Sequence, residues 1–213
     1  CIRRTRFCFL CYTKGKKRLY MTTTHTRLRT LIECALMVAL GTILAQIKLF
    51  DMPFGGSVTL LSMLPFILIS FRHGVKWGLF TGFINSLLQM MMGFYPPPAN
   101  TVLAYVGVVL LDYVLAFTLL GTADLVAKRF SNQTVGVACG TIWACALRFL
   151  CSFLSGALLW GSYQSSYEWA EGLNVWVYSL IYNGTYMLPE TILTALAAVL
   201  LVKAAPRLFQ SEI

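Results

Sequence analysis

The fold class is decided by residues 101–123, which read TVLAYVGVVLLDYVLAFTLLGTA. The stretch contains one charged residue, Asp112, and is otherwise dominated by Val, Leu, Ala and aromatic side chains. A helix needs about 20 mostly apolar residues to cross the roughly 30 Å of hydrocarbon in a bilayer. The sequence therefore predicts a membrane-spanning helix here.

The rest of the chain has the same character, since 58% of its 213 residues are hydrophobic and only 12% are charged. A soluble domain carries about 25% charged residues, so the composition excludes an ordinary cytosolic enzyme. Irregular backbone is expected beside Gly55 and Gly56, where the second apolar stretch begins and is short. The sequence predicts an all-α integral membrane bundle of six transmembrane helices, at residues 29–48, 57–71, 75–93, 101–123, 134–160 and 181–203.

Basic residues concentrate in alternate loops, as they do on the cytoplasmic side of membrane proteins. One side of the predicted bundle carries Arg27, Arg29, Arg72, Lys76, Lys128, Arg129, Lys203 and Arg207. The other side carries Lys48 beside Asp51, the uncharged loop 94–100, and the acidic Glu168 and Glu171. Both termini of this multi-pass membrane protein are therefore predicted to be cytoplasmic.

The net charge of +9 comes largely from one tail, because seven of the 17 Lys and Arg residues lie in residues 1–20. Without them the chain has ten basic and eight acidic residues, so no basic groove for nucleic acid is implied. A polar stretch of the kind that precedes a first span follows Met21. We expect residues 1–20 not to be native and residues 21–213 to form one membrane domain. The alternative is a polybasic segment attracted to anionic lipid.

The sequence offers little for a bound metal or a catalytic centre. Beyond the tail, the cysteines stand singly inside apolar runs and only two His occur in the chain, so a zinc site is not expected. No Walker phosphate loop, HExxH or GxSxG motif is present. We predict that the chain is not an enzyme and binds no cofactor itself. Uphill transport of a solute would need an ion gradient or a partner ATPase.

Three ionisable side chains lie deep inside predicted spans, where charge is expensive and marks a functional candidate: Asp112, Arg148 and Glu190. Arg148 and Glu190 are as consistent with a neutralising structural pair as with a functional role. Asp112 is more informative, because Tyr113 follows it in an otherwise apolar run. A lone carboxylate suits a ligand that is cationic or presents paired N–H donors. The alternative is a hydrogen-bonded acid that serves the fold.

Aromatic and polar side chains alternate in residues 160–169, which read WGSYQSSYEW. Further aromatic and amide residues follow at Trp176, Tyr178, Tyr182, Asn183 and Tyr186. An interfacial aromatic belt would explain several of these rings. The interleaved Ser, Gln and Asn side chains favour a small-molecule pocket, in which ring faces hold a flat or cationic group.

Small residues recur at helical spacing and predict close helix packing. They are Gly74, Gly78 and Gly82, then Gly136 and Gly140, and on the first span Ala35 and Ala39. For the glycines we expect internal packing. For the alanine stripe, docking to another membrane protein is an open alternative.

Residues 176–190, which read WVYSLIYNGTYMLPE, carry a resemblance to a known family. The segment GGSVTL at 55–60, the pair Asp112–Tyr113, and Ser155–Gly156 with Trp160 support it. Over residues 21–207 the chain resembles the thiamine-specific substrate-binding subunit (S component) of energy-coupling factor (ECF) vitamin transporters. The resemblance implies a six-helix bundle that captures thiamine outside the cell. It also implies inward release by docking on a membrane coupling protein and two ATPase subunits, which use the ATP.

The resemblance also implies roles for particular residues. Asp112 would hold the aminopyrimidine, Trp160 would stack on the ligand, and Ala35 and Ala39 would contact the coupling protein. The polar contacts would be Tyr113, Tyr178 and Asn183. Thiamine joins a thiazolium cation to a flat aminopyrimidine, so rings and a carboxylate suit its two halves.

The chain departs from the family at three positions. Ser152 stands where some members have a His near the ligand, and Gly56 and Asn85 stand where certain members have aromatic contacts. Rings could instead come from residues 163–169, with Tyr163 the first of them, or the ligand could be a related one such as a pyrimidine precursor. The residues alone also leave room for a solitary carrier driven by protons or sodium, a membrane-embedded enzyme or a purely structural subunit.

Overall fold

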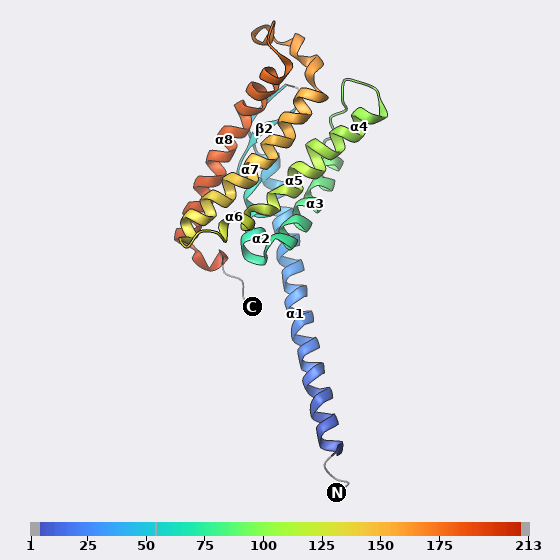
Figure 1. Cartoon of the computed structure of the whole chain (residues 1–213), viewed down its shortest axis with the longest axis vertical. Coiled ribbons are helices and arrows are strands. Elements are labelled where there is room, and N and C mark those ends of the chain that lie inside the picture. The colour runs from blue at the N-terminus through green and yellow to red at the C-terminus, as the bar shows by residue number, and fades with distance from the viewer. Residues whose placement is uncertain (1–4, 54, 210–213) are drawn as a thin grey trace. The chain divides into compact units, whose positions relative to one another are not determined.

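The computed structural model describes residues 5–53 and 55–209, with side chains from residue 26 onward. The chain divides into two units, Cys1–Leu36 and Met37–Ile213. The described part of the first unit is helical, and the second unit contains several packed helices and a small antiparallel sheet (Figure 1).

Helix α1 (Thr5–Gln46) begins before the first predicted span and ends two residues short of its predicted end at residue 48, where strand β1 starts. Its segment Thr26–Gln46 is apolar and, at 1.5 Å per residue, about 31 Å long, which is enough to cross a bilayer. The small residues Ala35 and Ala39 on this segment are exposed. Of the tail predicted not to be native, residues 1–4 lie outside the described part of the chain, and only helical backbone is described for the rest.

A short hairpin follows α1, where the sequence predicts only helix and loop. Strand β1 (Lys48–Asp51) pairs antiparallel with β2 (Ser57–Thr59), with Asp51 opposite Ser57. The backbone reverses through Gly55 and Gly56, whose φ angles of +98° and +90° lie in the left-handed region that glycine adopts freely. The irregular backbone expected at these glycines is therefore confirmed, whereas helix from residue 57 onward is wrong.

Helix α2 (Leu64–His73) is shorter than the predicted second span. Its ten residues extend about 15 Å, too little to cross a bilayer alone. Pro65 occupies the first turn, where its missing N–H costs no hydrogen bond, and the helix ends at Gly74. Residues 65–70 are buried, so α2 is an internal helix of the second unit.

Helix α3 (Val75–Met92) follows at once, and its glycines confirm the expected internal packing. A Cβ atom on Gly82 would lie 2.5 Å from the carbonyl oxygen of Phe117. A Cβ atom on Gly78 would lie 2.8 Å from the carbonyl oxygen of Gly121. Gly74 does not share this role, since no atom lies within 4 Å of the same position there.

The next membrane segment is one helical rod with two irregular turns. It consists of α4 (Val102–Val108), the π-helical η1 (Val109–Leu115), α5 (Ala116–Thr118), the 3-10 turn η2 (Leu119–Thr122) and α6 (Ala123–Ala127). The whole rod is long and apolar enough to cross a membrane. Asp112 lies inside the π-helical turn, a feature that often occurs at functional sites.

Helices α7 (Gln133–Leu158) and α8 (Val175–Ala204) pack along one another and complete the bundle (Figure 1). The side chains of Asn132 and Asn174 accept backbone hydrogen bonds at their N-termini, as N-cap residues do. Between them lie the short 3-10 helices η3 (Gly161–Ser166) and η4 (Glu168–Ala170). After α8 comes η5 (Pro206–Phe209). Helix α8 begins six residues before the predicted span, because Asn174 provides its N-cap.

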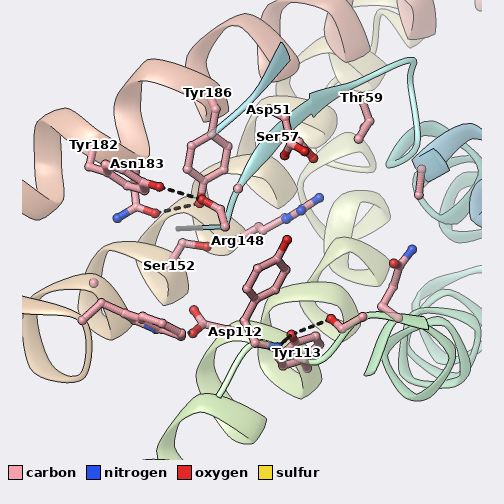
Figure 2. Close-up of a pocket in the computed structure, with 18 of the residues that line it drawn as sticks. Asp51, Ser57, Thr59, Asp112, Tyr113, Arg148, Ser152, Tyr182, Asn183 and Tyr186 are labelled. Atoms are coloured by element: carbon pink, nitrogen blue, oxygen red, sulfur yellow. Dashed lines mark hydrogen bonds between the residues drawn. The ribbon is translucent and has the colours of Figure 1, made fainter. Parts of the chain in front are cut away.

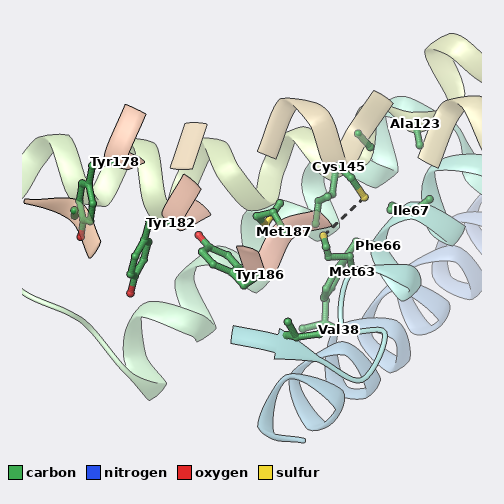
Figure 3. Close-up of a cluster of buried hydrophobic side chains, with 14 residues drawn as sticks. Val38, Met63, Phe66, Ile67, Ala123, Cys145, Tyr178, Tyr182, Tyr186 and Met187 are labelled. Carbon is green, nitrogen blue, oxygen red and sulfur yellow. Dashed lines mark hydrogen bonds between the residues drawn. The ribbon is translucent and has the colours of Figure 1, made fainter. Parts of the chain in front are cut away.

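The core of the second unit consists of an aliphatic, sulfur-containing part and a part made of tyrosines (Figure 3). In one part, the sulfur atoms of Met63 and Cys145 lie 4.0 Å apart among aliphatic side chains. In another, three tyrosines four residues apart on α8 have ring centroids 5.7 Å and 6.3 Å from one to the next. They are Tyr178, Tyr182 and Tyr186. This tyrosine row borders the cavity described below.

Candidate functional site

A cavity of about 360 Å³ lies within the second unit, enclosed by the hairpin, α3, η1, α7 and α8 (Figure 2). The seven residues predicted as substrate contacts all line it. They are Asp112, Tyr113, Ser152, Trp160, Tyr163, Tyr178 and Asn183. The fold therefore brings together residues that are up to 71 positions apart in the sequence, and their role in binding stays a prediction.

Asp112 is held by two donors from α7 and the turn after it. Ser155 Oγ donates to Asp112 Oδ2 at 2.6 Å, and Trp160 Nε1 donates to the same oxygen at 2.9 Å. Within the described residues, Oδ1 accepts no hydrogen bond. The carboxylate thus has one oxygen fixed by the protein and one available to a ligand.

Tyr113, the next residue, fixes the chain after α3. Its hydroxyl donates to the carbonyl oxygen of Gly93 and accepts from the backbone N–H of Tyr95, both at 3.0 Å. Its ring stacks on Phe94 with centroids 5.6 Å apart. The hydroxyl predicted to contact a ligand is already bonded on both sides, so Tyr113 contributes to the cavity wall and positions this loop.

One face of α7 lines the cavity at four-residue spacing through Arg148, Ser152 and Gly156, and the same spacing continues to Trp160 beyond its end. Gly156 permits close contact with α8, since a Cβ atom there would lie 2.7 Å from the amide nitrogen of Asn183. The Trp160 ring stacks on Tyr163 with centroids 5.8 Å apart. This face supplies both polar and aromatic surface.

The side-chain amide of Asn183 on α8 makes three hydrogen bonds within the protein. Its Nδ2 donates to the carbonyl oxygen of Ser179 at 3.0 Å and to Ser179 Oγ at 3.2 Å. Its Oδ1 accepts from the hydroxyl of Tyr186 at 2.7 Å. Asn183 therefore orients Tyr186 toward the cavity. The sequence predicts Asn183 only as a direct contact to the substrate and does not indicate this second role.

The tip of the hairpin rests on the tyrosine row. Tyr182 Oη donates to the carbonyl oxygen of Gly55 at 2.9 Å. A Cβ atom on Gly56 would lie 2.6 Å from the ring of Tyr186, so only glycine allows this approach. Gly56, the position at which certain members of the resembled family have an aromatic contact, therefore places its own backbone against the Tyr186 ring.

The other two departures from the family differ in position. Ser152 lines the cavity, and Figure 2 shows it directed into the same space as Asp112 and Tyr186. Asn85 on α3 is fully buried and is not part of the cavity wall. An aromatic side chain at position 85 would therefore lie buried between helices and would not reach the cavity.

Arg148 and Glu190 do not form the neutralising pair that the sequence leaves open. The guanidinium of Arg148 lies 4.6 Å from the centroid of the Phe117 ring, and its Nη1 has no hydrogen-bond partner in the described part of the chain. Glu190 instead accepts hydrogen bonds from Thr59 and Ser62. Arg148 therefore lies against an aromatic ring, whereas Glu190 is bonded to two hydroxyl groups.

Charged groups also lie at the hairpin. Lys48 Nζ and Asp51 Oδ2 form an ion pair at 2.8 Å, and both residues line the cavity. The hydrogen bond to Asp51 raises the pKa of Lys48 above its ordinary value. Both side chains are partly exposed, so this pair contributes little to stability. Among the described residues, no three His, Cys, Asp or Glu side chains gather closely enough to hold a metal ion.

Several residues of the cavity wall are absent from the predicted set of substrate contacts. The polar ones with the clearest contacts are Thr59, Ser62, Arg148, Tyr182 and Tyr186. A signal existed for the tyrosines, because spacing of four from Tyr178 places all three on one helix face. No comparable signal exists for Thr59 and Ser62, which reach the cavity through an irregular turn.

Comparisons with known proteins identify the family of the chain. A family model described as thiamine transporter protein (Thia_YuaJ) matches residues 31–210. The chain is 37% identical over 193 residues to the thiamine transporter ThiT of Bacillus subtilis (strain 168), covering 85% of this chain and 94% of the relative. It is 27% identical over 206 residues to the thiamine transporter ThiT of Lacticaseibacillus paracasei, covering 88% of this chain and 94% of the relative.

A solved structure of ThiT from Listeria monocytogenes shares the fold, with a TM-score of 0.69 and 24% sequence identity. The match covers 86% of this chain and 98% of that one. Four described helices are long and apolar enough to cross a membrane. The family match and these helices show that the chain is a multi-pass membrane protein that belongs to the thiamine transporter (Thia_YuaJ) family, which consists of transporters and not enzymes.

Proposed function

We propose that this chain captures thiamine outside the cell and passes it inward as the substrate-binding subunit of an ECF importer in the bacterial plasma membrane. The observation that carries the proposal is Asp112, a carboxylate with one oxygen fixed and one available in a cavity lined by aromatic rings. The names of the two relatives, thiamine transporter ThiT, support the choice of substrate.

The cavity suits both halves of thiamine. The aminopyrimidine can donate N–H to Asp112 Oδ1, a charge-assisted bond that is strong where water is excluded. The thiazolium cation can lie against tyrosine faces, which attract cations. The row of Tyr178, Tyr182 and Tyr186 offers such faces along the same wall.

We propose six membrane segments, formed by the four long apolar helices together with the shorter α2 and α3, with both termini cytoplasmic. Within Met37–Ile213, the α2–α3 turn, the α6–α7 turn and the end of α8 lie at one end of the bundle (Figure 1). These turns carry most of the basic residues of the bundle, which supports their cytoplasmic placement. The cavity then opens toward the outside, near the hairpin.

Partner subunits would supply the driving force. In this proposal a membrane coupling protein contacts the stripe of Ala35 and Ala39, and two ATPase subunits consume the ATP. The exposure of both alanines supports their use as a contact surface. This chain itself would bind only the vitamin.

A binding experiment tests the substrate. Thiamine titrated into the purified, detergent-solubilised chain should quench its Trp fluorescence, and Asp112→Asn should weaken binding about 10- to 100-fold, because a hydrogen bond to a charged group is lost. Asp124→Asn is a matched control in the same membrane segment, since Asp124 pairs with Lys128 and lies outside the cavity wall. A folded wild-type protein that gives no response to thiamine would overturn the substrate assignment.

Reconstitution tests the mode of transport. Thiamine should accumulate in proteoliposomes only when the coupling protein, both ATPases and ATP are present. Accumulation by the chain alone under a proton or sodium gradient would instead establish a solitary carrier, and would overturn the importer proposal.

A further inference from the structure

A buried polar cluster borders the cavity away from Asp112. Glu190 is 1% exposed, and its Oε1 accepts hydrogen bonds from Thr59 Oγ1 at 2.5 Å and from Ser62 Oγ at 3.3 Å. The two hydroxyl oxygens lie 2.6 Å apart, and both residues line the cavity wall. The second carboxyl oxygen, Oε2, is buried without a hydrogen-bond partner among the described residues. A carboxyl group placed this way inside a membrane protein is costly and marks a functional candidate.

The turn that brings the hydroxyls together has an unusual backbone. Leu61, between Thr59 and Ser62, has a φ of +61°, which non-glycine residues adopt rarely. Such conformations persist where the surroundings impose them, often at ligand sites. Here the result is that two hydroxyls reach one carboxyl oxygen.

The available hydrogens decide what this cluster can offer a ligand. Each hydroxyl has one hydrogen and two acceptor lone pairs. Each hydroxyl hydrogen points either to Glu190 Oε1 or to the other hydroxyl oxygen. Neither hydrogen is left for the cavity, so Thr59 and Ser62 face it as acceptors only.

A donor lines the same cavity at a distance from Asp112. Ser155 binds Asp112 from α7, and Arg148 lies seven residues before Ser155 on the same helix, about 10 Å along the helix axis. Arg148 Nη1 has no hydrogen-bond partner in the described chain. Figure 2 shows the Arg148 guanidinium directed toward the side of the cavity where Thr59 is drawn.

We propose that Thr59 and Ser62, oriented by Glu190, form with Arg148 a subsite that recognises an alcohol at the end of the substrate remote from Asp112. An alcohol is both donor and acceptor, so it can give its hydrogen to the hydroxyl oxygens and accept one from Arg148. The inference rests on the proposed function, since in thiamine this group is the hydroxyethyl arm of the thiazolium ring. Glu190 acts as a positioning residue, and it disfavours a phosphate ester, which at neutral pH has little hydrogen to donate.

The test compares thiamine with an analogue that carries an ethyl group in place of the hydroxyethyl arm. In the wild-type chain the analogue should bind about 10- to 100-fold more weakly, because it leaves buried polar groups unpaired. Thr59→Val should reduce this ratio to about threefold or less, and Thr59→Ser should restore it, because only the hydroxyl is required. The matched control is Thr81→Val, since Thr81 is buried, bonds to the Trp77 carbonyl within α3 and does not line the cavity.

A second arm tests Glu190. Glu190→Gln should improve the binding of thiamine monophosphate relative to thiamine by about tenfold, because the amide can donate a hydrogen bond and carries no charge. An unchanged preference would overturn the role of Glu190. Equal affinity of the wild type for thiamine and the ethyl analogue, or a ratio that Thr59→Val leaves unchanged, would overturn the subsite. If neither compound binds a folded wild type, the proposed function fails, and this inference fails with it.

Discussion

Ser155 Oγ on α7 lies 2.6 Å from Asp112 Oδ2 on the π-helical turn η1, within hydrogen-bonding distance across two helices. Trp160 binds the same oxygen from the end of α7. Two donors on one oxygen fix the rotation of the carboxylate. Because the side chain is already ordered before the ligand arrives, binding does not cost the entropy of ordering it. The affinity of the site therefore depends on residues that need not touch the ligand.

Removing the Ser155 hydroxyl should weaken thiamine binding without unfolding the protein. We expect Ser155→Ala to cost about 1–2 kcal/mol, or roughly five- to thirtyfold in Kd, because the bond involves a charged group in a buried setting. Isothermal titration in detergent measures this. Ser86→Ala is the control, since Ser86 is a buried serine that bonds to the Phe83 carbonyl and does not line the cavity. An affinity unchanged by Ser155→Ala would show that Asp112 needs no fixed orientation.

Trp160 should contribute through its N–H as well as its ring. Trp160→Phe keeps an aromatic ring beside Tyr163 but removes the donor to Asp112, and we expect about five- to twentyfold weaker thiamine binding. Trp160→Ala removes both and should weaken binding further. Equilibrium binding of radiolabelled thiamine avoids relying on the Trp signal. Equal losses in the two variants would mean that the ring adds nothing.

The hairpin tip should tolerate no side chain at Gly56. Gly56→Ala adds a Cβ atom 2.6 Å from the Tyr186 ring at a φ of +90°, and we expect it to lower thiamine affinity at least tenfold by lifting the tip away from α8. Gly172→Ala is the matched control, because Gly172 has a φ of +76° but no atom within 4 Å. The control separates backbone strain from the clash, and similar losses in both variants would contradict the role of the contact.

The contact between α3 and α5 should likewise tolerate no side chain at Gly82. Gly82→Val would place its Cβ 2.5 Å from the carbonyl oxygen of Phe117, and we expect a loss of about 1–3 kcal/mol in the free energy of unfolding. Thermal unfolding in detergent, followed by circular dichroism, measures it. Gly184→Val on α8 is the control, since nothing lies within 4 Å of that position. A variant at Gly82 as stable as the control would show that α3 can shift freely.

Much of the fold follows from the hydrophobic pattern. The four long apolar helices are predictable, because about 20 apolar residues in a row have few other uses. The hairpin is not, since the three residues of β2 carry too little pattern to distinguish a strand from the start of a helix. The short helix α2 has the composition of a membrane span but is enclosed by protein. Composition alone cannot distinguish an apolar helix that faces lipid from one that is buried inside the bundle.

The candidate site was predictable where one helix carries it. Tyr178 and Asn183 lie five residues apart in the polar, aromatic part of α8, and Asp112 is recognisable as the single charged residue in an apolar run. Contacts across elements could not be foreseen. Nothing in the spacing indicates that Thr59 and Glu190, 131 positions apart, share a hydrogen bond, or that Asn183 serves Tyr186 within the protein.

The π-helical turn has a consequence for how this membrane segment can vary. The buried residues nearest the turn are Ala104 and Val108 before it, Ala116 and Leu120 after it, and Tyr113 within it. The step of five from Val108 to Tyr113 would rotate a regular α-helix off its buried face, and the wider turn absorbs it. Loss of one residue here would restore a step of four and a regular α-helix, with both halves still in phase. The wide turn therefore adds one residue to the segment at the level of Asp112 without changing the face that α5 presents to α3.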